Sequence, residues 1–197
     1  MTSSRPYRKT KRALSEAETR QRIVEATVGL HESVGPAKTT VKAIAERAGV
    51  QRATVYKHFP DLRALFEACN AHYYGRHPMP DPGSWATITL PSERFQFALR
   101  ALYAWYEETE PMLSVGIRDI DTVPSAVRET FLGYFQLVAR SLMAGRRERG
   151  RVRRRVAAAI GHAISFATWR SLVRDGSLSS EEAAGLMHAM VEVASMS

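Results

Sequence analysis

Apolar residues recur three or four positions apart along most of the chain, which is the spacing of an α-helix, and no stretch alternates as a half-buried strand does. Within residues 19–71, turn signals divide this pattern into four short helices. The first three end at Gly35, Gly49 and Pro60, because glycine readily adopts the left-handed conformation after a helix and proline cannot continue one. Asp61 can cap the start of the fourth helix.

Longer helices are expected in the C-terminal half. Residues 76–91 contain four prolines, so we expect a connecting loop there. The apolar pattern then predicts a helix after this loop, and Pro111 either ends that helix or starts the next one. It also predicts a long helix over residues 127–142 and another over residues 156–172. Glu181 and Glu182 suit the positive start of a last helix. The sequence therefore predicts an all-α fold of about nine helices, divided into an arm (residues 1–18), a small domain (19–75) and a larger domain (76–197).

Residues 41–59 have the spacing of a helix-turn-helix, in which the second helix enters the major groove of DNA. The small Ala45 permits the two helices to cross closely, and Gly49 makes the turn. On the second helix Val55 and Phe59 lie four residues apart and face inward. The other side chains face outward and are hydrogen-bond donors suited to phosphates and base edges: Arg52, Thr54, Tyr56, Lys57 and His58.

The net charge of +8 at pH 7 is concentrated in two basic segments, residues 5–12 and residues 146–155. A polyanion such as DNA suits this balance, because each phosphate that lysine or arginine neutralises releases counterions. The first segment, in the arm, can reach the minor groove or the adjacent backbone, with a disordered solubilising tail as the alternative. For the second segment we expect a solvated surface.

Composition places the chain among ordinary globular proteins, with 197 residues, 45% hydrophobic and 24% charged. Cys69 is the single cysteine, so no intrachain disulfide can form and nothing indicates an oxidising compartment. The first residues lack the apolar core of a signal peptide, and no later run approaches the roughly 18 apolar residues of a membrane span. The expected location is the cytoplasm, without a membrane partner.

The string from Ile44 to Val50, followed by Thr54 to Phe59, resembles the signature of the TetR family of repressors. The resemblance is strong over residues 20–66, and beyond them only helix count and spacing fit. It implies an all-helical dimer in which helices one to three bind DNA, middle helices enclose a ligand and the last two long helices form the interface. It also implies that ligand binding moves helix four and spreads the two reading heads, which releases the repressor from its operator.

By that resemblance, seven residues at the start of helix two and in the recognition helix are candidates for DNA contact: Thr40, Lys42, Arg52, Thr54, Tyr56, Lys57 and His58. Two positions depart from the family pattern. The family usually has serine or threonine where Gln51 stands, which weakens the N-cap of the recognition helix. It also has lysine where Leu62 stands, so a phosphate contact is missing that Arg63 only partly replaces.

Most aromatic residues of the larger domain lie on helices that would surround an internal cavity, which predicts an apolar or aromatic effector. For each of them singly, filling the core is the alternative. His162, one turn from Phe166, can donate an orienting hydrogen bond. The candidates for effector contact are Tyr103, Trp105, Tyr106, Met112, Phe131, Phe135, His162, Phe166 and Trp169.

The last two helices carry more apolar surface than one side of their own domain needs, as Leu186, Met187, Met190 and Val191 show. Small residues over 159–167 permit a close approach of the preceding helix. We therefore expect a homodimer built on a four-helix bundle with two-fold symmetry. The same symmetry predicts a roughly palindromic operator.

The sequence gives little support for an enzymatic function. No phosphate-binding glycine loop, nucleophile elbow or paired histidine–carboxylate motif is present, so an all-helical enzyme is the weaker hypothesis. Cys69 and His72 are three residues apart, but His77 falls off their face, so we expect neither a metal site nor a cofactor. A helix-turn-helix factor that binds DNA without any effector is the remaining alternative.

Overall fold

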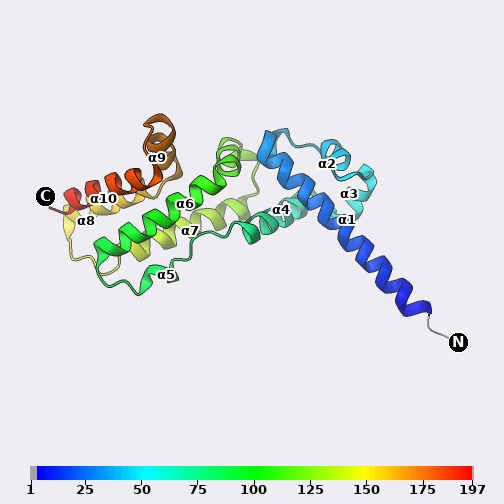
Figure 1. Cartoon of the computed structure of the whole chain (residues 1–197), viewed down its shortest axis with the longest axis horizontal. Helices are drawn as coiled ribbons and strands as arrows, with labels where there is room; N and C mark the ends of the chain where they lie inside the picture. The colour runs from blue at the N-terminus through cyan, green and yellow to red at the C-terminus, as the bar shows by residue number, and fades with distance from the viewer. Residues whose placement is uncertain (1–3, 197) are drawn as a thin grey trace. The chain divides into compact units, whose positions relative to one another are not determined.

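The computed structural model describes the backbone of residues 4–196 and the side chains of residues 13–196, and all regular structure in this part is helical. Ten α-helices are present in it, with two 3-10 turns and one π-helical turn (Figure 1). The all-α prediction is confirmed, with one α-helix more than expected. Contacts divide the chain into an N-terminal unit (Met1–Arg76 with Pro111–Val127) and a C-terminal unit (His77–Glu110 with Arg128–Ser197).

The N-terminal unit packs its helices around one small apolar core. Ile23, Ile44, Val55, Phe59 and Leu65 are each at most 2% exposed and come from consecutive helices and one cap. Burying side chains of this size supplies most of the stability of a small domain. The helices of this unit are α1 (Ser4–Val34), η1 (Pro36–Lys38), α2 (Val41–Ala48), α3 (Arg52–His58), α4 (Leu62–Arg76), the end of α6 and η2 (Ile120–Thr122).

Helix α1 is longer than the sequence pattern indicated. It begins at Ser4, so residues 4–18, expected to form an arm, continue the first helix. The basic side chains of residues 5–12 lie outside the described side chains. Because α1 has 31 residues, its N-terminal half extends beyond the part that packs against the small core.

The C-terminal unit is a second helical bundle with its own core. Its largest fully buried side chains include Trp85, Phe95, Tyr103, Tyr106 and Trp169. One short helix, α5, lies in the segment expected to be a loop. The helices of this unit are α5 (Gly83–Ala86), most of α6 (Pro91–Arg118), α7 (Ser125–Met143), α8 (Gly150–Ala163), α9 (Phe166–Arg170), η3 (Ser171–Asp175) and α10 (Ser180–Met196).

Pro111 lies inside α6, so the expectation that it ends one helix or starts the next is wrong. Proline lacks the N–H that the helical hydrogen bond needs, but a helix with many other bonds tolerates the loss of one. The expected short helix after residue 112 is the last part of α6, which runs to Arg118. Residues 91–118 therefore form one helix where two were expected.

The single long helix expected over residues 156–172 is also wrong, because α8 ends at Ala163 and α9 starts after a bend of 61°. Side-chain hydroxyls satisfy the carbonyls at the end of α8. Tyr103 Oη donates to the Ala163 carbonyl at 2.9 Å, and Tyr106 Oη donates to that of Ile164. Ser165 then caps α9, accepting from the N–H of Ala167 at 3.2 Å. The two tyrosine hydroxyls replace backbone donors that a continuous helix would supply, and the Ser165 hydroxyl replaces a backbone acceptor.

Within residues 4–196, no single helix has both the length and the apolar composition to cross a membrane. Helix α8 meets both conditions only when it is counted together with α9 and η3, from which a bend of 61° separates it.

Candidate DNA-binding site

Helices α2 and α3 are joined by the tight turn that the sequence predicts. Thr40 caps α2, because its Oγ1 accepts from the N–H of Ala43 at 3.1 Å. Gly49 has a φ of 65°, the left-handed conformation that an L side chain rarely adopts, and ends the helix. The N–H of Val50 donates to the Ala45 carbonyl at 2.9 Å, which closes the turn. Ala45 is itself buried, so a larger side chain there would separate the helices.

Helix α3 has one face in the core and one face in solvent. Val55 and Phe59, its C-cap, are buried, as their spacing predicts. Tyr56 is 54% exposed, which is an unusual position for a large aromatic ring. Of the other candidates on α3, Arg52 and Lys57 are exposed, and Thr54 and His58 are half-buried.

The start of α3 is poorly capped. Gln51 stands at the N-cap with extended backbone, and its side chain makes no capping hydrogen bond. This agrees with the departure from the family pattern at this position of the sequence. The N–H of Thr54 donates to the Gln51 carbonyl at 2.9 Å, and the first two N–H groups of α3 are left to solvent or to another acceptor.

We expect Gln51→Ser to stabilise the chain, because a serine hydroxyl at an extended N-cap accepts from the second or third N–H of the helix. The expected gain in the free energy of unfolding is roughly 0.5–1 kcal/mol, measured by urea denaturation. Gln51→Ala is the matched control, since alanine also lacks a capping oxygen. Equal stability of the serine and alanine variants would contradict this account of the cap.

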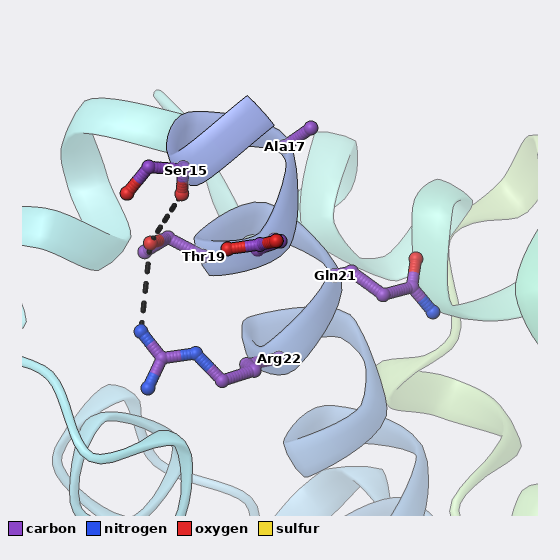
Figure 2. A pocket seen from close by; sticks show the side chains of 6 residues that line it. Ser15, Ala17, Thr19, Gln21 and Arg22 are labelled. Carbon is purple, nitrogen blue, oxygen red and sulfur yellow. Dashed lines mark hydrogen bonds between the residues drawn. The ribbon is translucent and has the colours of Figure 1, made fainter. Parts of the chain in front are cut away.

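Helix α1 brings further charged groups close to the helix-turn-helix. The guanidinium carbon of Arg20 lies 4.7 Å from the centre of the Phe59 ring, a cation–π contact. A shallow open depression on α1 is lined by Ser15, Ala17, Glu18, Thr19, Gln21 and Arg22 (Figure 2). In Figure 2, Arg22 reaches back to Thr19, with Nη2 3.5 Å from Oγ1. The sequence pattern does not single out Arg20 or Arg22, because spacing alone does not show which face of α1 lies beside α3.

The loop between α1 and α2 is held by residues that follow it by about 80 positions. Asp119 Oδ2 accepts from the N–H of Ala37 at 3.1 Å, and Arg118 Nη2 donates to the Val34 carbonyl at 2.8 Å. The hydrogen bond from Arg118 lowers the pKa of Asp119, and the bond from Ala37 adds to this. The hydrogen bonds of Arg118 and Asp119 therefore fix the chain just before the helix-turn-helix.

Residues 23–69 match the family model described as bacterial regulatory proteins, tetR family. The matched segment runs from the buried part of α1 to α4, and so contains the whole helix-turn-helix. Over residues 23–69 the chain is therefore similar to the TetR family of bacterial regulators. Its TetR signature therefore lies in the same elements that form the small core and present α3.

Two curated relatives match part of the chain. It is 34% identical over 88 residues to the HTH-type transcriptional regulator SrpR of Pseudomonas putida, covering 41% of the chain and 40% of SrpR. It is equally identical, over the same length, to an uncharacterized HTH-type transcriptional regulator, TtgW, also of Pseudomonas putida, covering 64% of that protein. The matches thus span less than two thirds of either relative.

Solved structures show that the likeness of fold extends beyond the matched segment. NalD, described as the secondary repressor of the MexAB-OprM multidrug efflux pump in Pseudomonas aeruginosa, has a TM-score of 0.62 at 18% identity, covering 91% of this chain and 96% of its own. A TetR-like transcriptional regulator from Rhodococcus sp. RHA1 has a TM-score of 0.61 at 19% identity, covering 88% and 93%. At these identities the comparison concerns the fold alone.

In the C-terminal unit, most effector candidates form one aromatic cluster. Tyr106 is its centre, with ring centroids of Trp105, Phe135, Phe166 and Trp169 5.5–6.4 Å away. Burial raises the pKa of the Tyr106 hydroxyl well above its usual value, so it remains a neutral donor. Seven of the nine candidates belong to this cluster: Tyr103, Trp105, Tyr106, Phe131, Phe135, Phe166 and Trp169.

Two effector candidates fall outside the aromatic cluster. His162 is exposed, and its ring nitrogens lie 3.4 Å from Thr168 Oγ1 rather than beside an aromatic ring. Met112 belongs to the N-terminal unit.

The side chains weighed as metal ligands have separate partners. Cys69 Sγ lies 3.4 Å from the Nδ1 atom of buried His31, and His72 Nδ1 lies 3.2 Å from Gln21 Nε2. His77 Nδ1 lies 2.7 Å from Glu108 Oε1. In the part of the chain that the structure describes, no three such ligands come together.

Proposed function

We propose that this chain is a transcription regulator of the TetR type that binds a palindromic operator as a homodimer and leaves it when an apolar or aromatic effector binds the C-terminal unit. The observation that supports DNA binding best is the two-sided character of α3. Its inner face is fixed in the core by Val55 and Phe59, while Arg52, Tyr56 and Lys57 stand in solvent. A recognition helix needs this combination, because its donors must reach the groove without disturbing the fold.

The seven proposed DNA contacts have different roles. Thr40 and Lys42, at the start of α2, and Lys57 suit phosphates, because they lie at the edges of the helix-turn-helix. Arg52, at the start of α3, suits a base edge, since the N-terminal residues of a recognition helix reach deepest into the groove. Tyr56 offers both a hydroxyl donor and an exposed ring. Thr54 and His58 complete the surface.

We expect Tyr56→Ala to lower the affinity for the operator roughly tenfold or more, within the range of about 1–3 kcal/mol typical of one specific contact. The operator is first obtained by selecting genomic fragments on the purified protein, and its affinity is then measured by fluorescence anisotropy. Helix content is expected to stay unchanged, because the ring does not enter the core.

Leu132→Ala is the matched control for Tyr56→Ala. Leu132 is 59% exposed and lies in the C-terminal unit, so its loss removes a comparable exposed surface away from α3. Operator affinity unchanged in Tyr56→Ala, or lowered equally in both variants, would contradict the proposed reading face.

The aromatic cluster supports the proposed effector. Rings that already pack against one another can separate to admit a flat apolar molecule, and Tyr103 and Tyr106 hydroxyls would then exchange partners with the end of α8. The description of NalD as a repressor favours repression as the direction of control. If no aromatic compound that binds the purified chain changes its operator affinity, the effector-independent alternative is favoured.

The proposed dimer uses α8 and α10, which pack together in the C-terminal unit (Figure 1). Leu186, Met190 and Val193 form an exposed apolar stripe along α10, with 43%, 51% and 62% of each residue in solvent. Of the residues expected in the interface, Met187 and Val191 are instead buried within their own chain. On α8, Ala157 and Gly161 are exposed and small enough for a close helix approach.

A further inference from the structure

One cation of the recognition helix is already paired with an acid. Lys57 Nζ lies 3.2 Å from Glu16 Oε1, and both side chains are partly in solvent, at 62% and 47% exposed. Glu16 lies on the N-terminal part of α1, 41 residues earlier in the chain. The acid therefore stands at the edge of the surface that α3 presents to DNA.

An exposed ion pair of this kind is weak. Such pairs contribute little to stability, because water solvates both charges and two long side chains must be held in place. The pair is thus unnecessary for the fold of α3, which its buried residues hold. A phosphate that approached Lys57 would have to displace the Glu16 carboxylate, and would be repelled by it while it remained nearby.

We propose that Glu16 competes with DNA phosphate for Lys57 and so lowers the affinity of the reading head for duplex DNA of any sequence. The inference rests on the proposed DNA binding of α3. Because a phosphate contact carries no sequence information, the penalty falls on operator and random duplexes alike. Glu16 thereby lowers the affinity of the helix-turn-helix for non-specific DNA.

The test is Glu16→Gln, which keeps the size of the side chain and removes its charge. At low salt we expect the dissociation constants for the operator and for a random-sequence duplex to fall two- to fivefold. The gain is expected to shrink as salt rises, because ions screen the exposed pair. Anisotropy titrations of the full chain at several salt concentrations measure both effects.

Glu18→Gln is the matched control, since Glu18 is exposed on the same helix two residues away. It makes the same change in net charge. We expect a smaller gain from it, which gives the general effect of removing one acid near DNA. In a Lys57→Ala background, the difference between Glu16→Gln and Glu18→Gln is expected to shrink, because the ion pair with Lys57 is gone.

Two other results have distinct meanings. If Tyr56→Ala weakens operator binding but Glu16→Gln only equals Glu18→Gln, or weakens binding, the competition is wrong and the proposed function stands. A weakening would mean that Glu16 instead positions Lys57 for its phosphate. If Tyr56→Ala leaves operator binding unchanged, the proposed function of α3 fails, and the inference fails with it.

Discussion

Met190→Asp is expected to convert the proposed dimer into monomers and to abolish tight operator binding. Met190 is 51% exposed in the single chain and stands in the middle of the apolar stripe on α10, between Leu186 and Val193. In a two-fold interface each substitution occurs twice, so two unpaired carboxylates would be buried. We expect the dissociation constant of the dimer to rise more than 100-fold, which corresponds to about 3 kcal/mol.

Sedimentation at micromolar concentration measures the change in mass. Leu132→Asp provides the control, because Leu132 is a similarly exposed apolar residue of the same unit on α7. It is expected to leave the dimer intact. A wild-type chain that sediments as a monomer while binding a palindrome tightly would overturn the proposed interface.

The choice of Met190 over Met187 depends on the structure. The sequence places both on the apolar face of the last helix, three residues apart, and gives no sign of which one meets its own domain. Met187 is 4% exposed and packs inside its own unit. An aspartate at that position would destabilise the single chain, so loss of the dimer there would prove nothing about the interface.

Elements set by signals within a few residues could be predicted from the sequence. The cap at Thr40, the left-handed Gly49 and the cap at Asp61, which accepts from the N–H of Ala64 at 2.7 Å, depend on their immediate neighbours. The i, i+4 pair Val55 and Phe59 likewise fixes the inner face of α3. Elements built from such signals follow from the pattern, and with them the position of the reading face.

The features that the sequence did not reveal depend on residues far apart in the chain. The end of α8 is stabilised by Tyr103 and Tyr106, about 60 positions earlier in the chain. The grip of Asp119 on the loop at Ala37 spans 82 positions. The Glu16–Lys57 pair joins two helices whose facing sides spacing does not reveal. Such contacts become visible only when the helices are placed in space.

Lowering the pH from 7.5 to 5 is expected to destabilise the N-terminal unit through His31. This side chain is 6% exposed, beside Cys69 and 5.0 Å from the Phe66 ring centre. Burial lowers its pKa from 6.5 to about 4, because the charged imidazolium loses its hydration.

The direction of the effect follows from proton uptake. Below pH 6.5 the unfolded chain binds a proton at His31, while the folded chain stays neutral there until about pH 4. The stabilising contribution is therefore complete above pH 6.5 and is lost as the pH falls toward 4, with a loss of about 2 kcal/mol at pH 5.

Urea unfolding of wild type and His31→Gln at both pH values measures this loss of stability. We expect the variant to lose about 2 kcal/mol less than wild type on acidification, whereas His162→Gln, at an exposed position, is expected to follow wild type. The same loss in His31→Gln as in wild type would show that acid acts through other groups.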